Sequence, residues 1–191
     1  MGERSRQKLV EATATLLRAR GYHGTGRSQI IEASGAPRGS LYFHFPGGKE
    51  ALAAMALSLA GAAMRDELAA VLDAAPTLAE GAREVCREMA RQLVDSDYQY
   101  GCPIATVALE AAAESDELHR VCASSYGAWR GLLEERLARL GVAPDHAAEL
   151  ATFGLAAVEG GMLLCKAERS PRPLEVVGDQ LAALIALVIP A

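Results

Sequence analysis

The chain has few cysteines, and they are not arranged as a disulfide framework or as metal-binding pairs. Cys86, Cys102, Cys122 and Cys165 lie far apart, and no C-x-x-C pair occurs. The N-terminus also lacks the pattern of a secretory signal. This cysteine usage is typical of a reduced protein, so we expect a cytoplasmic localisation.

Long hydrophobic runs are also missing. The most apolar segment, 181–189, covers nine residues and directly follows Asp179 and Gln180. A helix needs about 20 apolar residues to cross a bilayer. We therefore expect no membrane partner.

The motifs of common enzyme classes are absent. The sequence has no G-x-S-x-G, no H-E-x-x-H, no phosphate-cradling loop and no dinucleotide fingerprint, and its four histidines are dispersed. His119 and Cys122 lie three residues apart on an expected helix. A metal site needs three or four ligands, however, so we interpret this pair as incidental. The prediction is a protein that is not an enzyme, without catalytic residues, metal or cofactor.

Strand signals are scarce, because apolar residues recur at intervals of three and four and β-branched residues do not alternate. The 191 residues, 51% of them hydrophobic, suffice for one small and one larger helical unit. The pattern predicts an all-α fold of about nine or ten helices, with a head at 1–48 and a body at 49–191. The longer helices are expected at 4–20, 49–73, 78–94, 104–114, 116–140, 145–168 and 174–189.

Charge is distributed unevenly along the chain. The net charge is -5, which taken alone argues against a nucleic-acid partner. Residues 1–50, however, hold eight basic and four acidic side chains, whereas the remaining residues hold eleven basic and twenty acidic ones. The first segment is thus +4 and the rest -9, as expected when only one end of a protein meets phosphate.

Residues 21–50 have the pattern of two short helices joined by a tight turn. The first helix should end at Ser34-Gly35, because glycine readily adopts the left-handed conformation. Pro37 suits the start of the second helix, which should extend to His44. This is a helix-turn-helix, and it predicts that the second helix lies in the major groove of double-stranded DNA.

The same segment resembles the TetR family of bacterial transcriptional repressors. The matching residues are Gly21, Tyr22, Thr25, Ile30, Gly35, Gly39, Ser40, Leu41, Tyr42, Phe45, Lys49, Glu50 and Leu52. Residues 100–106 and the Pro-Gly-Gly-Lys that ends in Lys49 are similar to the LmrA/YxaF-like branch. The resemblance implies a ligand-responsive repressor that an effector releases from a palindromic operator, with repression rather than activation taken from the family alone.

The second short helix supplies the main candidates for contact with operator DNA. Arg38 could read a guanine or touch only phosphate, and these two roles are about equally supported. Lys49, at the start of the long helix, is expected to hold a phosphate. Arg27 stands where the family has an apolar residue, so it either snorkels away from the core or binds phosphate. The complete predicted set is Thr25, for which helix capping is the stronger alternative, with Arg27, Ser28, Arg38, Gly39, Ser40, Tyr42, His44 and Lys49.

A head this short reaches only one half-site, so a homodimer is expected to place two heads about 34–36 Å apart. The last two helices offer apolar faces for a four-helix interface. Glycines within these helices would permit close approach of the partner. The predicted interface residues are Leu155, Val158, Gly161, Leu181, Leu184, Ile185 and Val188.

Soft and aromatic residues in the body are compatible with a pocket for a small hydrophobic or aromatic effector, and equally with an ordinary core. The predicted pocket residues are Met55, Cys86, Met89, Leu93, Tyr126, Trp129, Phe153 and Met162, with Tyr98, Tyr100 and Glu159 as possible polar contacts. A dimeric helical carrier of apolar molecules without a DNA function is an alternative, and an enzyme is a weaker one. The +4 head favours the regulator.

Overall fold

The computed structural model describes residues 2–189, and this part of the chain consists of nine helices without a strand. It confirms the prediction of an all-α fold. The helices are α1 (Gly2–Arg20), α2 (Arg27–Ser34), α3 (Ser40–His44), α4 (Gly48–Ala74), α5 (Leu78–Asp95), α6 (Pro103–Ala111), α7 (Asp116–Arg139), α8 (Pro144–Glu168) and α9 (Arg172–Val188).

The chain divides into two compact units. Unit 1 comprises 1–63 and 102–125, and unit 2 comprises 64–101 and 126–191. Helices α4 and α7 each contribute their first part to unit 1 and their second part to unit 2. Unit 1 thus includes α6 and the start of α7 in addition to the expected head, so the boundary expected after residue 48 lies inside it.

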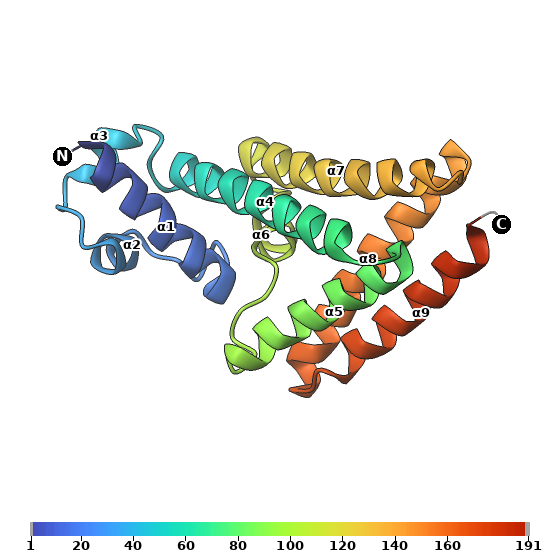
Figure 1. Ribbon diagram of the computed structural model, residues 1–191. Helices are drawn as coiled ribbons and strands as arrows, with labels where there is room; N and C mark the ends of the chain where they lie inside the picture. Colours follow the sequence, from blue (N-terminus) through green and yellow to red (C-terminus); the bar gives the residue numbers. More distant parts are fainter. Residues whose placement is uncertain (1, 190–191) are drawn as a thin grey trace. The chain divides into compact units, whose positions relative to one another are not determined.

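In unit 1, α1 packs against α2, α3 and α6 (Figure 1). The contact is apolar because one stripe of α1, with Leu9, Val10 and Leu17, is buried. Ile30 of α2 and Leu41 of α3 are also fully buried. Burying these side chains fixes both short helices against α1, which leaves their opposite faces exposed.

The ends of the short helices follow from single residues. Gly35 has a φ of 60°, the left-handed conformation expected at the end of α2, and its N–H donates to the carbonyl of Glu32. α3 begins at Ser40, not directly after Pro37 as expected. The reason is that Ser40 donates its N–H to the Pro37 carbonyl, which closes a turn before Phe43 makes the first helical bond to Gly39.

In unit 2, α5 packs closely on α9 and also contacts α8 (Figure 1). Gly178 permits the approach of α9 to α5, because a Cβ at this position would lie 3.0 Å from the Cβ of Cys86. On the surface of the same helix pair, Arg83 of α5 forms an ion pair with Asp179 of α9 at 3.1 Å. The tight pairing of these two helices makes α5, α8 and α9 one packed layer.

Helix α8 is unusually apolar. It is the one helix within residues 2–189 that is long and apolar enough to cross a membrane by length and composition, and only 22% of its most apolar window is buried within the chain. Length and composition alone are weak evidence for a membrane span, because a helix that packs inside a soluble protein has the same properties. Most of the apolar window of α8 is thus exposed on the single chain.

Candidate DNA-binding surface and apolar cavity

The exposed faces of α2 and α3 carry a directly bonded pair of polar side chains. Arg27 of α2 donates a hydrogen bond from Nη1 to the hydroxyl of Tyr42 of α3 at 2.6 Å, and both side chains are exposed. The head group of Arg27 therefore lies away from the core, which is compatible with both alternatives, and its contact with phosphate stays a prediction. The pair presents a cation and a phenol on the same side of the two helices.

Other predicted DNA contacts lie on this part of the chain. Ser28, Arg38 and Gly39 are exposed, whereas Ser40 and His44 are half-buried. Phe43, which sequence reasoning did not single out, has a side chain that is 79% exposed and stacks edge-on against His44, with the ring centroids 4.9 Å apart. No sequence signal revealed this exposure, because Phe43 lies between the buried Leu41 and Phe45 in a mostly aromatic run.

Thr25 is not available to DNA, which corrects the prediction that included it. Its side chain is fully buried, and its hydroxyl donates to the carbonyl of Gly21 at 2.6 Å. It does not cap α2 either, because Gly26 occupies the capping position and donates its N–H to the side chain of Gln29. Thr25 instead closes the turn that follows α1.

Lys49 has partners inside unit 1. Its Nζ donates to the carbonyl of Tyr22 at 2.7 Å and lies 4.0 Å from the centroid of the Tyr22 ring. Burial lowers the pKa of the Lys49 ammonium below its usual value, and the charge of Arg27 lowers it further. The structure thus gives Lys49 a role in holding the turn after α1, and its contact with phosphate stays a prediction.

The same turn is also held by Glu110 of α6, a residue that sequence reasoning did not single out. One carboxylate oxygen accepts hydrogen bonds from the backbone N–H groups of Tyr22 at 2.7 Å and His23 at 3.1 Å. Gly21 adopts a φ of 69°, and a Cβ there would overlap the Glu110 carboxylate. The partners are 87 or more residues apart in sequence, so no local pattern could reveal the contact.

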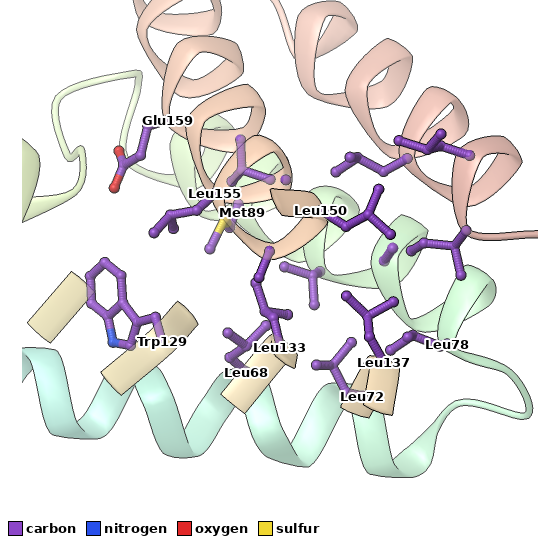
Figure 2. A pocket seen from close by; sticks show the side chains of 18 of the residues that line it. Leu68, Leu72, Leu78, Met89, Trp129, Leu133, Leu137, Leu150, Leu155 and Glu159 are labelled. Carbon is purple, nitrogen blue, oxygen red and sulfur yellow. The ribbon is translucent and has the colours of Figure 1, made fainter. Parts of the chain in front are cut away.

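A second feature, an apolar cavity of about 110 Å³, lies inside unit 2 (Figure 2). Its walls come from the second parts of α4 and α7 and from α5, α8 and α9. Wall residues recur at intervals of three and four on each helix, as expected for inward faces. They are Met64, Leu68, Leu72, Leu78, Ala82, Val85, Met89, Trp129, Leu133, Leu137, Leu150, Ala151, Gly154, Leu155, Val158, Glu159, Met162, Leu181, Leu184 and Ile185.

The cavity contains part of the predicted pocket. Met89, Trp129 and Met162 line it as expected. The ring of Tyr126 stands edge-on to Trp129 at 5.3 Å, and its hydroxyl donates to Glu159 at 3.1 Å. Tyr126 is therefore next to the cavity wall, although it does not form part of it.

The other four predicted pocket residues lie elsewhere, which corrects this part of the prediction. Phe153 is 56% exposed on the outer face of α8, and Met55 belongs to unit 1. Cys86 and Leu93 are buried in α5 without lining the cavity, and Cys86 packs against α9 at Gly178. Apolar character alone could not distinguish cavity wall, core and exposed face.

The predicted interface residues of the last two helices also need correction. Five of them, namely Leu155, Val158, Leu181, Leu184 and Ile185, line the internal cavity. Gly161 is buried, and a Cβ there would lie 3.1 Å from Leu174 and 3.2 Å from Val177 of the same chain. Val188 is half-buried, and its contact with a partner stays a prediction. Exposed apolar residues of these helices include instead Phe153, Ala156, Gly160, Leu163, Leu164 and Ala167 of α8, with Val176, Ala183, Ala186 and Leu187 of α9.

The cysteines and acids offer no metal centre. Within residues 2–189, no group of three or more histidine, cysteine or acidic side chains could hold a metal ion. All four cysteines are free and buried. Burial, together with the neighbouring Cys165, raises the pKa of the Cys86 thiol to about 11. A thiol with such a pKa is a poor nucleophile at neutral pH.

Two family models match the parts of the chain that contain these two features. Residues 9–56 match the family model of bacterial regulatory proteins of the tetR family. Residues 79–180 match the model described as transcriptional regulator LmrA/YxaF-like, C-terminal domain. The first match contains α2 and α3, and the second contains most of the cavity walls.

Relatives extend the similarity over nearly the whole chain. The HTH-type transcriptional regulator LmrA of Bacillus subtilis is 37% identical, over 89% of this chain and 90% of its own length. YxaF of the same organism is 31% identical, over 95% of each chain.

Solved structures have the same fold. A TetR transcriptional regulator from Chloroflexus aurantiacus has a TM-score of 0.82 and 28% identity, and the match covers 97% of this chain and 96% of that one. A cysteine mutant of the TetR family regulator CifR, complexed with double-strand operator DNA, has a TM-score of 0.79 and 26% identity, over 93% and 94% of the two chains. The chain therefore belongs to the TetR family of transcriptional regulators, with a body of the LmrA/YxaF type.

Proposed function

We propose that this protein is a cytoplasmic repressor that binds a palindromic operator as a homodimer and is released by a small hydrophobic or aromatic effector. The observation that carries the proposal is the exposed surface of α2 and α3, where Arg27, Arg38, Tyr42 and Phe43 are exposed within a segment of net positive charge. Cations and hydroxyls at a helix-turn-helix suit the phosphates and base edges of duplex DNA. Membership of a family of DNA-binding regulators supports the same function.

Within this surface, we assign separate roles to positively charged and aromatic side chains. The bonded pair of Arg27 and Tyr42 is suited to one phosphate, which accepts hydrogen bonds from both. Arg38 lies just before α3 and is exposed, so it is the candidate for guanine. Phe43 is suited to apolar contact with a thymine methyl group. Arg27 and Tyr42 would thus position the head on the DNA backbone, whereas Arg38 and Phe43 would read the base sequence.

Dimerisation is supported by the uncovered apolar residues of α8 and α9. Phe153, Gly160, Leu163 and Leu164 recur at helical spacing on the exposed side of α8. Leu187 of α9 is 83% exposed. A monomer would leave this surface in water, whereas a second copy of the chain would bury it. The pairing would be isologous, so one dimer would present two heads to the two halves of a palindrome.

Release by an effector requires that the effector prefer the conformation that does not bind the operator. The cavity in unit 2 is the proposed effector site, because its walls are apolar and come from five helices. By linkage, operator DNA must weaken effector binding by the same factor. An effector that binds both conformations equally would not act as an inducer.

Binding of the purified protein to fluorescently labelled DNA from the region flanking its own gene tests the DNA-binding function. We expect fluorescence anisotropy to report specific binding that weakens steeply between 50 and 200 mM salt, since phosphate contacts release counterions. An unrelated duplex of equal length is the control. Equal affinity for both duplexes, or no binding at low salt, would contradict the proposed function.

A further inference from the structure

We propose that the effector is a small apolar molecule, about one ring in size, with a hydrogen-bond donor such as a phenol O–H or an ammonium N–H, and that Glu159 receives this donor. The inference rests on the proposed function, because it specifies the ligand of the same cavity. It also states what the cavity should reject, namely carboxylates and other anions.

The cavity is polar at one place only. Of the residues that line it, Glu159 is the one with an ionisable side chain, and no lysine, arginine or histidine takes part in the walls. Figure 2 shows that Glu159 and Trp129 lie at one end of the cavity, and Leu72, Leu78 and Leu137 lie at the other. The cavity thus has an apolar end and a carboxylate end, and a matching ligand is amphipathic.

The chemistry of a carboxylate decides the polar group of the ligand. An ionised carboxylate accepts hydrogen bonds and donates none. A ligand hydroxyl or ammonium can therefore donate to Glu159, whereas a ligand carboxylate would add a like charge between apolar walls. Tyr126 donates to one Glu159 oxygen at 3.1 Å, and its ring stands edge-on to Trp129, so this bond orients the carboxylate at the end of the cavity where Trp129 lies (Figure 2). An ammonium at this end would also face an aromatic ring, which favours cations.

The volume of the cavity limits the size of the apolar part of the ligand. The cavity measures about 110 Å³. An engineered apolar protein cavity of about 150 Å³ binds benzene. The conformation described here thus accommodates a group on the order of a single ring, and a larger body requires the walls to move apart.

Four ligands with one apolar body and different polar groups test the inference directly. The probes are para-ethylphenol, para-ethylbenzylamine, para-ethylbenzoate and para-ethyltoluene, and binding is followed by the fluorescence of Trp129, the sole tryptophan of the chain, which lines the cavity. Charge-assisted hydrogen bonds predict that the phenol and the amine bind roughly tenfold or more tightly than the toluene. The benzoate should bind most weakly of the four.

Variants of Glu159 then test whether its carboxylate causes the preference for ligands with a donor. In Glu159→Leu, the phenol and the amine should lose roughly tenfold or more in affinity, whereas the toluene should bind at least as tightly as before. Glu159→Gln keeps an acceptor and removes the charge, so the amine should lose more affinity than the phenol, and the benzoate should gain. Glu168→Gln is the matched control, because Glu168 lies on the same helix, is exposed and does not line the cavity. Thermal melting of each variant reports whether the fold is retained.

The outcomes separate this inference from the proposed function. Tightest binding of the benzoate, no binding of any probe to the wild-type protein, or the same loss in Glu168→Gln would overturn the inference. An unchanged ranking in a folded Glu159 variant would do so as well. Anisotropy of labelled promoter DNA is measured on the same samples: promoter binding without the expected ligand ranking refutes only the ligand class, and the expected ranking without promoter binding refutes only the regulator.

Discussion

The guanidinium of Arg27 donates a hydrogen bond to the Tyr42 hydroxyl at 2.6 Å, although the two residues belong to different helices. Both side chains remain exposed, so the bond adds little to the stability of the fold. Its effect is to hold a cation and a phenol in one position on the outer surface of α2 and α3. The two side chains thus lose conformational entropy before DNA binds. Less entropy is then lost on binding, which favours a phosphate contact.

Replacement of Arg27 by alanine should therefore weaken binding to all DNA sequences and reduce the salt dependence. The slope of log affinity against log salt should fall by about one unit, because one phosphate contact is lost. Anisotropy at several salt concentrations measures this slope. Arg172→Ala is the control, since it removes the same charge from an exposed position at the start of α9 in unit 2. A slope unchanged in Arg27→Ala would show that this arginine does not contact phosphate.

Glu110→Ala should loosen the turn that follows α1. The change removes the acceptor of the Tyr22 and His23 backbone N–H groups, and we expect the free energy of unfolding to fall by about 1–3 kcal/mol. Hydrogen exchange at these two amides should become faster, and denaturant unfolding measures the loss of stability. The control is Glu114→Ala, because Glu114 is exposed and its carboxylate lies 3.8 Å from the His23 ring without accepting from these two amides. Equal effects of the two variants would argue against the role of Glu110.

Gly160→Arg should dissociate the proposed dimer. A Cβ at position 160 meets no atom within 4 Å in the chain itself, so the substitution should leave the protomer folded while a long cation disrupts the apolar surface of α8. Sedimentation velocity at micromolar concentration measures the change in mass. Gly131→Arg on α7 is the matched control, since it is also exposed, helical and free of neighbours within 4 Å. If Gly160→Arg still sediments as a dimer, the interface lies elsewhere.

Stability should decrease at alkaline pH through Cys86. The pKa of this thiol is about 11 in the fold and near 9 in the unfolded chain, so the unfolded state releases its proton first. The stabilising contribution is complete below pH 9 and is lost as the pH rises toward 11. Cys86→Ala should remove this part of the alkaline decrease, as measured by denaturant unfolding at pH 8, 9 and 10. An identical pH dependence in the variant would contradict the pKa.

Most helix ends could be predicted from the sequence because local residues determine them. Gly35 ends α2 through its left-handed conformation, and Pro103 begins α6 where its missing N–H costs nothing. The predicted start of α3 was wrong by about two residues, because the turn from Pro37 to Ser40 resembles a first helical turn.

The inward-facing sides of α8 and α9 could not be predicted, for a different reason. α8 is apolar on both faces, one lining the cavity with Leu155 and Val158 and the other exposed with Phe153 and Leu163. Hydrophobic periodicity identifies an inward face only when the opposite face is polar. The contacts of Lys49 and Glu110 with the turn after α1 also escape such reasoning, because they join residues distant in sequence.

The central claim is that two copies of this chain place their α3 helices on one palindromic duplex. Sedimentation of the protein with a labelled promoter duplex that carries the proposed palindromic operator measures the number of chains bound to each duplex. We predict two chains, or a multiple of two, on each duplex, and loss of the complex when Arg38 is replaced by alanine or when one half-site is scrambled. A complex that contains a single chain, or one that persists unchanged with a scrambled half-site, would contradict the account.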